Sequence, residues 1–130
     1  MESYYFRKLD VYKRSMNLTK DIYVLLKKYP SEERYDLCSQ IRRAVTSIPI
    51  NIAEGFGRFS SKEKAHFISI AYGSLTEISC ELELSMMLNY ISVEEFGNIE
   101  NQLLVIGKQL SSLHSSILKN SDKDGKIPNP

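Results

Sequence analysis

Apolar residues recur every three or four positions along most of the chain, which is the spacing of one face of an α-helix. The pattern predicts four helices, at about residues 6–29, 31–56, 61–90 and 93–119, and no stretch of useful length alternates as a β-strand does. The connections are short, so neighbouring helices are expected to be antiparallel. The prediction is an all-α protein, an up-down-up-down four-helix bundle over residues 1–120 with a polar C-terminal tail over residues 121–130.

The fourth segment has the most regular stripe, an unbroken alternation of three- and four-residue steps. The second and third segments have core stripes of the same kind. The residues expected in these three stripes are Leu37, Ile41, Ala44, Ile48 and Ile52; Ile68, Ala71, Leu75, Ile78, Leu82 and Met86; and Phe96, Ile99, Leu103, Ile106, Leu110, Leu113 and Ile117.

The first segment has two apolar seams side by side, which together make a wider face than one bundle contact needs. Such a face either packs entirely in the core or serves a subunit interface. The main seam is expected to be Leu9, Tyr12, Met16, Thr19, Tyr23 and Leu26, and the second is Val11, Leu18 and Leu25.

Helix starts are indicated by capping residues. Ser31 is expected to be the N-cap of the second helix, since two glutamates follow it. Ser60 with Glu63, and Ser92 with Glu95, each have the spacing of a capping box.

The most unusual stretch covers residues 40–58, where costly residues for a helix interrupt an apolar stripe. Pro49 lies inside the stripe and has no amide hydrogen to donate, so a kink is expected there rather than a stop. Ser47, Asn51 and Glu54 are close enough in sequence to bond backbone groups that the proline leaves without partners. The loop that follows is also a candidate contact for a partner.

Glycines mark the end of the second helix, which is expected near Gly55 or Gly57 with a left-handed cap. The two glycines lack the strand context and the third glycine of a phosphate-binding loop. Gly73 and Ser74 mark a place where another backbone is expected to approach closely.

Paired charges predict one contact between helices. Glu77 and Glu81 share a helix face, where two like charges repel each other. Arg42 and Arg43 fall at about the height of Glu77 if the second and third helices are antiparallel. An arginine of this pair is therefore expected to form an ion pair with Glu77.

Positive charge is concentrated at the start of the chain, although the net charge is only +1. Residues 1–29 contain seven Lys or Arg and three Asp or Glu. This basic face is either simply solvated or a surface for phosphate groups, with Tyr4, Tyr5 and Phe6 available to stack on bases or to pack on a neighbouring subunit. The candidate nucleic-acid-binding residues are Arg7, Lys8, Lys13, Arg14, Arg58 and Lys62.

Catalytic chemistry is not indicated. Glu63 and His66 have the Glu-x-x-His spacing of one element of a di-iron bundle. A second such element is missing, because the position three residues before His114 is Ser111 and not a glutamate. Cys38 and Cys80 are expected to be buried free thiols without a base beside them. Neither a cofactor nor a metal is expected. No apolar run is long enough for a membrane span, and no signal peptide is recognisable, so a cytoplasmic, non-enzymatic protein is expected.

The chain resembles the 23S rRNA intervening sequence proteins, also called the S23 or four-helix bundle family. The resemblance covers about residues 6–118 and depends most on the string Ser-Ile-Pro-Ile-Asn-Ile-Ala-Glu-Gly at residues 47–55. It continues through Arg42, Arg43, Gly73 and Glu77. It implies an up-down bundle that assembles into a homopentamer, with no enzymatic role. It also implies kinship with the accessory variability protein of diversity-generating retroelements, whose basic surface binds nucleic acid.

Two functions are therefore compatible with the sequence. The first is a homo-oligomer that binds structured RNA or DNA through its first helix and the region of Arg58. The second is a scaffold or accessory subunit whose apolar faces bind a partner protein, such as a reverse transcriptase or a maturase-like enzyme.

Overall fold

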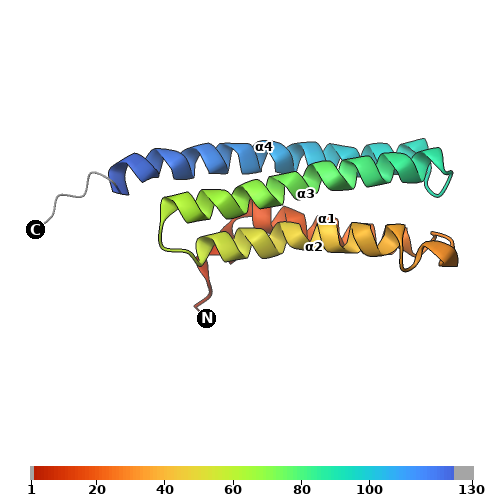
Figure 1. Cartoon of the computed structure of the whole chain (residues 1–130), viewed down its shortest axis with the longest axis horizontal. Coiled ribbons are helices and arrows are strands. Elements are labelled where there is room, and N and C mark those ends of the chain that lie inside the picture. The colour runs from red at the N-terminus through yellow and green to blue at the C-terminus, as the bar shows by residue number, and fades with distance from the viewer. Residues whose placement is uncertain (1, 125–130) are drawn as a thin grey trace, which may run out of the picture.

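The structure, a computed structural model, describes residues 2–124 of the 130-residue chain. The described residues contain helices and connecting turns but no strand, which confirms the all-α prediction. Four long helices run antiparallel to their neighbours (Figure 1). They are α1 (Asp10–Leu26), α2 (Leu37–Phe56), α3 (Ser61–Met87) and α4 (Val93–Asp124), with two short 3-10 helices, η1 (Tyr5–Lys8) and η2 (Ser31–Glu33).

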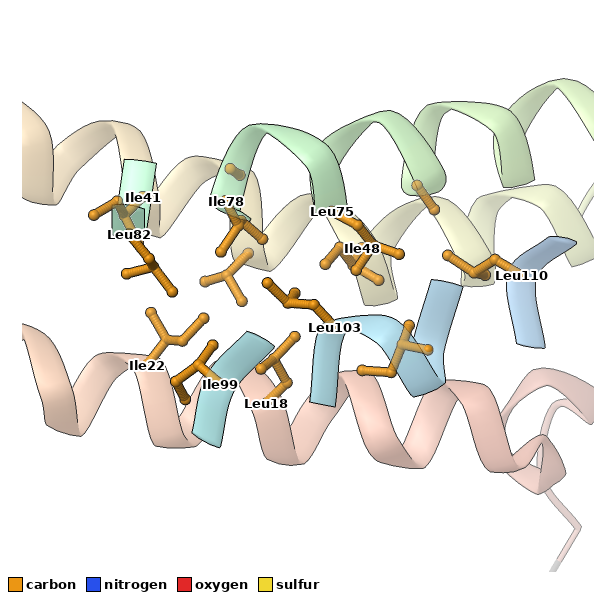
Figure 2. Packing of buried hydrophobic residues seen from close by; sticks show 14 of the residues in the cluster. Leu18, Ile22, Ile41, Ile48, Leu75, Ile78, Leu82, Ile99, Leu103 and Leu110 are labelled. Carbon is orange, nitrogen blue, oxygen red and sulfur yellow. The ribbon is translucent and has the colours of Figure 1, made fainter. Parts of the chain in front are cut away.

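One apolar core lies along the middle of the bundle, where side chains of all four helices meet (Figure 2). The stripes expected for α2, α3 and α4 point into it. Most of their residues are buried, whereas Leu37, Met86, Phe96 and Leu113 are half-buried at its margin. Fully burying a Leu or Ile side chain stabilises a fold by about 1.5–3 kcal/mol, so this core is the main source of stability.

The main seam expected for α1 is only partly correct. Leu26 is buried and Leu9 and Tyr12 are half-buried against the core, and Val11 and Leu18 of the second expected seam are buried. The buried residues are Val11, Ser15, Leu18, Ile22 and Leu26, whereas the expected seam residues Met16 and Tyr23 are 47% and 42% exposed. Burial of Ser15 interrupts the apolar pattern and shifts the apparent stripe. Its hydroxyl donates a hydrogen bond to the carbonyl of Tyr12 at 2.7 Å, so the polar group can be buried with a partner.

The connection between α1 and α2 also differs from the prediction. The first helix ends at Leu26, and Ser31 lies in the 3-10 helix η2 rather than at the N-cap of α2. Helix α2 begins six residues after Ser31, at Leu37, and Asp36 occupies its N-cap position. Pro30 has extended backbone angles and separates the two segments, because proline neither continues a helix nor donates to one.

The other helix ends follow the sequence more closely. Both capping boxes form: the amide of Glu95 donates to Ser92 Oγ at 3.0 Å, and the amide of Glu63 donates to Ser60 Oγ at 3.1 Å. At the other end, α4 continues to Asp124, into the stretch expected to be a tail. No glycine or proline precedes Gly125 there to stop the helix. The rest of the expected tail, residues 125–130, lies outside the described residues.

Candidate nucleic-acid interface

The short helix η1 folds back against the end of α2. The rings of Tyr5 and Phe56 lie 5.6 Å apart. On the same ring, the ammonium group of Lys64 lies 6.0 Å from the centroid of Phe56. The contact of Tyr5 with Phe56 holds η1 beside the end of α2, next to the α2–α3 connection.

This packing brings together four of the six basic residues predicted to bind nucleic acid. Arg7 and Lys8 come from η1, Arg58 from the α2–α3 connection and Lys62 from the first turn of α3. All four are exposed. With Lys64, these residues form the basic end of the bundle. The sequence pattern did not identify Lys64, because its side chain joins the group only through Phe56.

Aromatic rings and one carboxylate hold the arginines of the basic end. The guanidinium of Arg58 lies 4.7 Å from the centroid of Phe67 and also pairs with Glu54, with an N–O distance of 3.3 Å. That of Arg7 lies 4.8 Å from the centroid of Phe6. Cations over aromatic faces are attracted by the ring quadrupole. Both groups therefore remain at the surface in defined positions.

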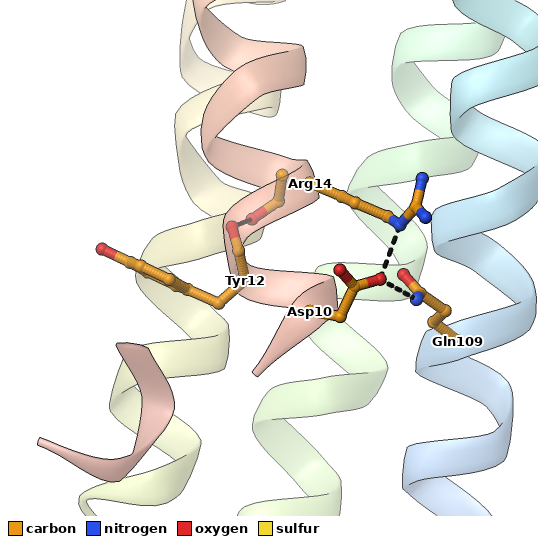
Figure 3. A network of polar contacts seen from close by, with 5 residues as sticks. Asp10, Tyr12, Arg14 and Gln109 are labelled. Carbon is orange, nitrogen blue, oxygen red and sulfur yellow. Dashed lines mark hydrogen bonds and ion pairs between the residues drawn. The ribbon is translucent and has the colours of Figure 1, made fainter. Parts of the chain in front are cut away.

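Lys13 and Arg14 do not belong to the basic end. Arg14 pairs with Asp10 of its own helix, with 2.6 Å between its Nε and Asp10 Oδ2 (Figure 3). Gln109 Nε2 donates to the same oxygen at 2.7 Å. The hydrogen bonds from Arg14 and Gln109 lower the pKa of Asp10 below its usual value. The charge of Arg14 is thus partly neutralised by Asp10. Lys13 is exposed, but it lies on α1 and not at the basic end.

Exposed aromatic rings lie within the basic end. Phe59 is fully exposed (102%), and Tyr4 and Tyr5 are 73% and 60% exposed. The tyrosines were candidates from the sequence, but Phe59 was not. The signal that could have found it is a bulky apolar residue next to Arg58 in a short polar connection, where no core is available to it.

Pro49 does not end α2, which continues through it to Phe56 as predicted. The carbonyl that loses its helical donor is that of Val45, four residues earlier. Thr19 of α1 contacts this oxygen, with its Oγ1 at 3.4 Å, and bonds its own helix at 2.8 Å. The expected role of Asn51 is wrong, because its side-chain amide donates to the carbonyl of Ser47 at 2.7 Å instead.

Other residues of the string 47–55 set the approach of α2 to α3. Ser47 Oγ shares a hydrogen bond with Ser74 Oγ. A Cβ atom added to Gly55 would lie only 3.2 Å from Phe67 Cβ and 3.3 Å from the Lys64 carbonyl. Of the two residues predicted to mark a close approach of another backbone, only Ser74 contacts α2 in this way. A Cβ atom added to Gly73 would meet nothing within 4 Å.

The end of α2 lies where the glycines indicated, but its geometry differs. Gly57 occupies the C-cap position with right-handed angles, φ −88° and ψ −4°. The left-handed cap expected there is wrong. Glu54, which was expected to bond a backbone group near Pro49, instead pairs with Arg58 one turn later.

The ion pair expected between Glu77 and Arg42 or Arg43 does not form within the described residues. Arg42 Nη2 donates to the carbonyl of Arg34 at 2.8 Å, back along its own chain. Glu77 is exposed. The charge of Arg43 acts instead on Glu81, one turn farther along α3. There it opposes a larger rise of the carboxyl pKa that has other causes. The register of the two helices thus favours Glu81 over Glu77.

Glu81 is the buried acid of the bundle. The residue is only 6% exposed, and neither carboxylate oxygen has a hydrogen-bond partner. Burial raises the pKa of Glu81 to about 7, and the charge of Glu77 adds to the rise, whereas Arg43 opposes it. Ser85 bonds the backbone carbonyl of Glu81 and not its carboxylate. The carboxyl group therefore keeps its proton to a higher pH than an ordinary glutamate does.

The described residues include no group of three His, Cys, Asp or Glu placed to hold a metal ion. Both cysteines are free thiols, but only Cys38 is buried; Cys80 is exposed, contrary to the expectation. None of the helices in the described part of the chain is both long and apolar enough to cross a membrane.

Residues 7–112 match the family model of the 23S rRNA-intervening sequence proteins. The chain belongs to this family. One similar solved structure is a protein of unknown function from the S23 ribosomal protein family of Bacteroides thetaiotaomicron. It shares 30% sequence identity and a TM-score of 0.74 with this member of the 23S rRNA-intervening sequence family, over 80% of this chain and 97% of that one. No curated protein matches this chain.

Proposed function

We propose that this 23S rRNA-intervening sequence family protein is a non-enzymatic cytoplasmic homo-oligomer, a pentamer, that binds structured RNA or DNA through its basic end. One observation carries the proposal: cations from η1, the α2–α3 connection and α3 gather around exposed aromatic rings. Lys and Arg contact phosphates whatever the sequence, and aromatic faces stack on unpaired bases. The near-neutral net charge places this binding on one end of the molecule rather than over its whole surface.

Self-association is supported by an apolar groove between α3 and α4. The groove has a volume of about 600 Å³, and its apolar lining residues are Tyr72, Leu75, Leu103 and Leu104, with Glu100, Lys108 and several hydroxyl side chains beside them. Tyr72 and Leu104 are 45% and 56% exposed. Exposed apolar surface of this kind is typical of subunit contacts. Copies joined along their sides would align their basic ends into one continuous surface.

The same groove supports a second function, an accessory subunit that binds a partner protein. A nucleic-acid enzyme such as a reverse transcriptase is the kind of partner that fits, because it would share the RNA or DNA bound at the basic end. In this alternative the nucleic acid is held mainly by the partner.

Molar mass in solution, measured by light scattering with and without a structured RNA, tests the proposal. We expect about five times the 14.9 kDa of one chain, and a complex that also contains the RNA mass. A particle of 14.9 kDa that takes up no RNA at low salt would contradict it. An oligomer that takes up no RNA would contradict the nucleic-acid part and favour the accessory subunit.

A further inference from the structure

A cleft lies at the opposite end of the bundle from the basic end, where α1, η2 and the start of α2 meet. Its volume is about 570 Å³, within the range of small-molecule sites. Tyr29 and Cys38, both buried, lie at its inner side. Three cationic side chains, Lys27, Arg34 and Arg42, line the rest together with Tyr23.

The charge of this cleft is unbalanced. No carboxylate lines it, and none of its three cations belongs to an ion pair of the described residues. A nearby acid, Glu33, accepts a hydrogen bond from Tyr90 OH at 2.8 Å, at the α3–α4 side. Glu32 and Asp36 are exposed on the connection itself and do not line the cleft. The charge of Glu33 reaches Cys38, and those of Glu95 and Glu81 reach Tyr29, at the inner side of the cleft. The three cations at its outer side have no acidic side chain among the lining residues.

Two features prepare the cleft for an oxyanion. Arg42 is half-buried and fixed, because its Nη2 donates to the carbonyl of Arg34 at 2.8 Å. The other N–H groups of its planar guanidinium can donate hydrogen bonds to phosphate oxygens. In addition, α2 begins beside the cleft, and the side chain of Asp36 does not cap its first turn. The free amides and the dipole of a helix start favour an anion.

We propose that this cleft binds the phosphate group of a nucleotide, either free or at the end of a nucleic-acid strand. Arg34 and Arg42 bind the phosphate, and Lys27 adds charge. Tyr23, which is 42% exposed at the same cleft, offers a ring face to the base. The site does not depend on the basic end, which lies at the other end of the bundle.

Calorimetric titration of the full chain at low salt tests the site with three probes: inorganic phosphate, adenosine monophosphate and a short single-stranded RNA. The test variants are Arg34→Gln, whose side chain is exposed, and Arg42→Gln. We expect each to weaken binding at least about tenfold, the loss of one charged hydrogen bond. The control Lys20→Gln removes one exposed lysine outside the cleft and should leave the affinity unchanged.

The probes separate the sources of the phosphate. Binding of adenosine monophosphate indicates a free nucleotide. RNA binding that Arg34→Gln and Arg42→Gln weaken, without binding of adenosine monophosphate, indicates a strand end, whereas RNA bound at the basic end is not affected by these variants. The variant Lys8→Gln/Lys62→Gln should leave mononucleotide binding intact, so failure of the basic end and failure of the cleft are distinguished. No binding of any probe, or an equal loss in the control variant, would overturn the proposal.

Discussion

The Glu81→Gln variant is expected to be more stable than the natural protein at pH 8.5, by about 2 kcal/mol in the free energy of unfolding, and nearly equal to it at pH 4.5. Folding raises the pKa of this carboxyl from 4.5 to about 7. The folded state therefore holds the proton more tightly than the unfolded state. Stability from this group is complete below pH 4.5 and is lost as the pH rises through about 7.

The size of the effect follows from the shift. A change of one pKa unit corresponds to about 1.4 kcal/mol, and we expect less than the full shift because penetrating water reduces the cost of the charge. Glutamine keeps the shape but never ionises. Urea unfolding at both pH values measures the difference.

An exposed glutamate two residues farther along the same helix provides the control. Glu83→Gln should change stability little at either pH. If Glu81→Gln has the same effect at both pH values, or lowers stability at pH 8.5, then Glu81 is not a buried acid that resists ionisation.

The Phe59→Ser variant is expected to bind structured RNA about five- to a hundredfold more weakly, with no loss of stability. Stacking of a base on an aromatic ring contributes about 1–3 kcal/mol. The ring of Phe59 is fully exposed, so its removal deprives the core of no packing. Fluorescence anisotropy with a labelled RNA that has an unpaired loop measures the affinity, and thermal unfolding measures the stability.

Tyr35→Ser is the matched control, because this ring is 83% exposed near the opposite end of the bundle and does not line the cleft. It should bind the RNA as the natural protein does. A similar loss in both variants would indicate a general surface effect. A fall in the unfolding temperature of Phe59→Ser alone would instead assign this ring to packing or to a subunit contact.

Helical periodicity was enough to predict the bundle, because each stripe that is apolar without interruption lies in the core. It failed where a polar residue is buried. The hydroxyl of Ser15 donates a hydrogen bond to a carbonyl of its own helix, so the residue can be buried. The pattern placed Met16 and Tyr23 in the main seam of α1, although both are exposed. Glu81 is buried as well, and its three- and four-residue spacing from Ile78 and Ser85, both buried, was the available sign.

The candidate sites were only partly predictable, because they depend on how distant segments meet. Arg58 and Lys62 were recognisable from the sequence, but their grouping with Arg7 requires the fold of η1 onto Phe56. The cleft of Arg34 depends on the 3-10 helix η2, whereas the sequence indicated a continuous helix from Ser31. Likewise, the bond from Thr19 to the carbonyl freed by Pro49 crosses between helices.

The salt dependence of RNA affinity, compared between the natural protein and Lys8→Gln/Lys62→Gln, tests the basic end most directly. Each lost phosphate contact lowers the slope of log K against log salt by about 0.9, so we predict a fall of about 2. The control Lys20→Gln removes an exposed lysine that lies outside both this end and the α3–α4 groove, and it should keep the natural slope. Equal slopes for all three proteins, or no RNA binding at low salt, would contradict a nucleic-acid interface at this end.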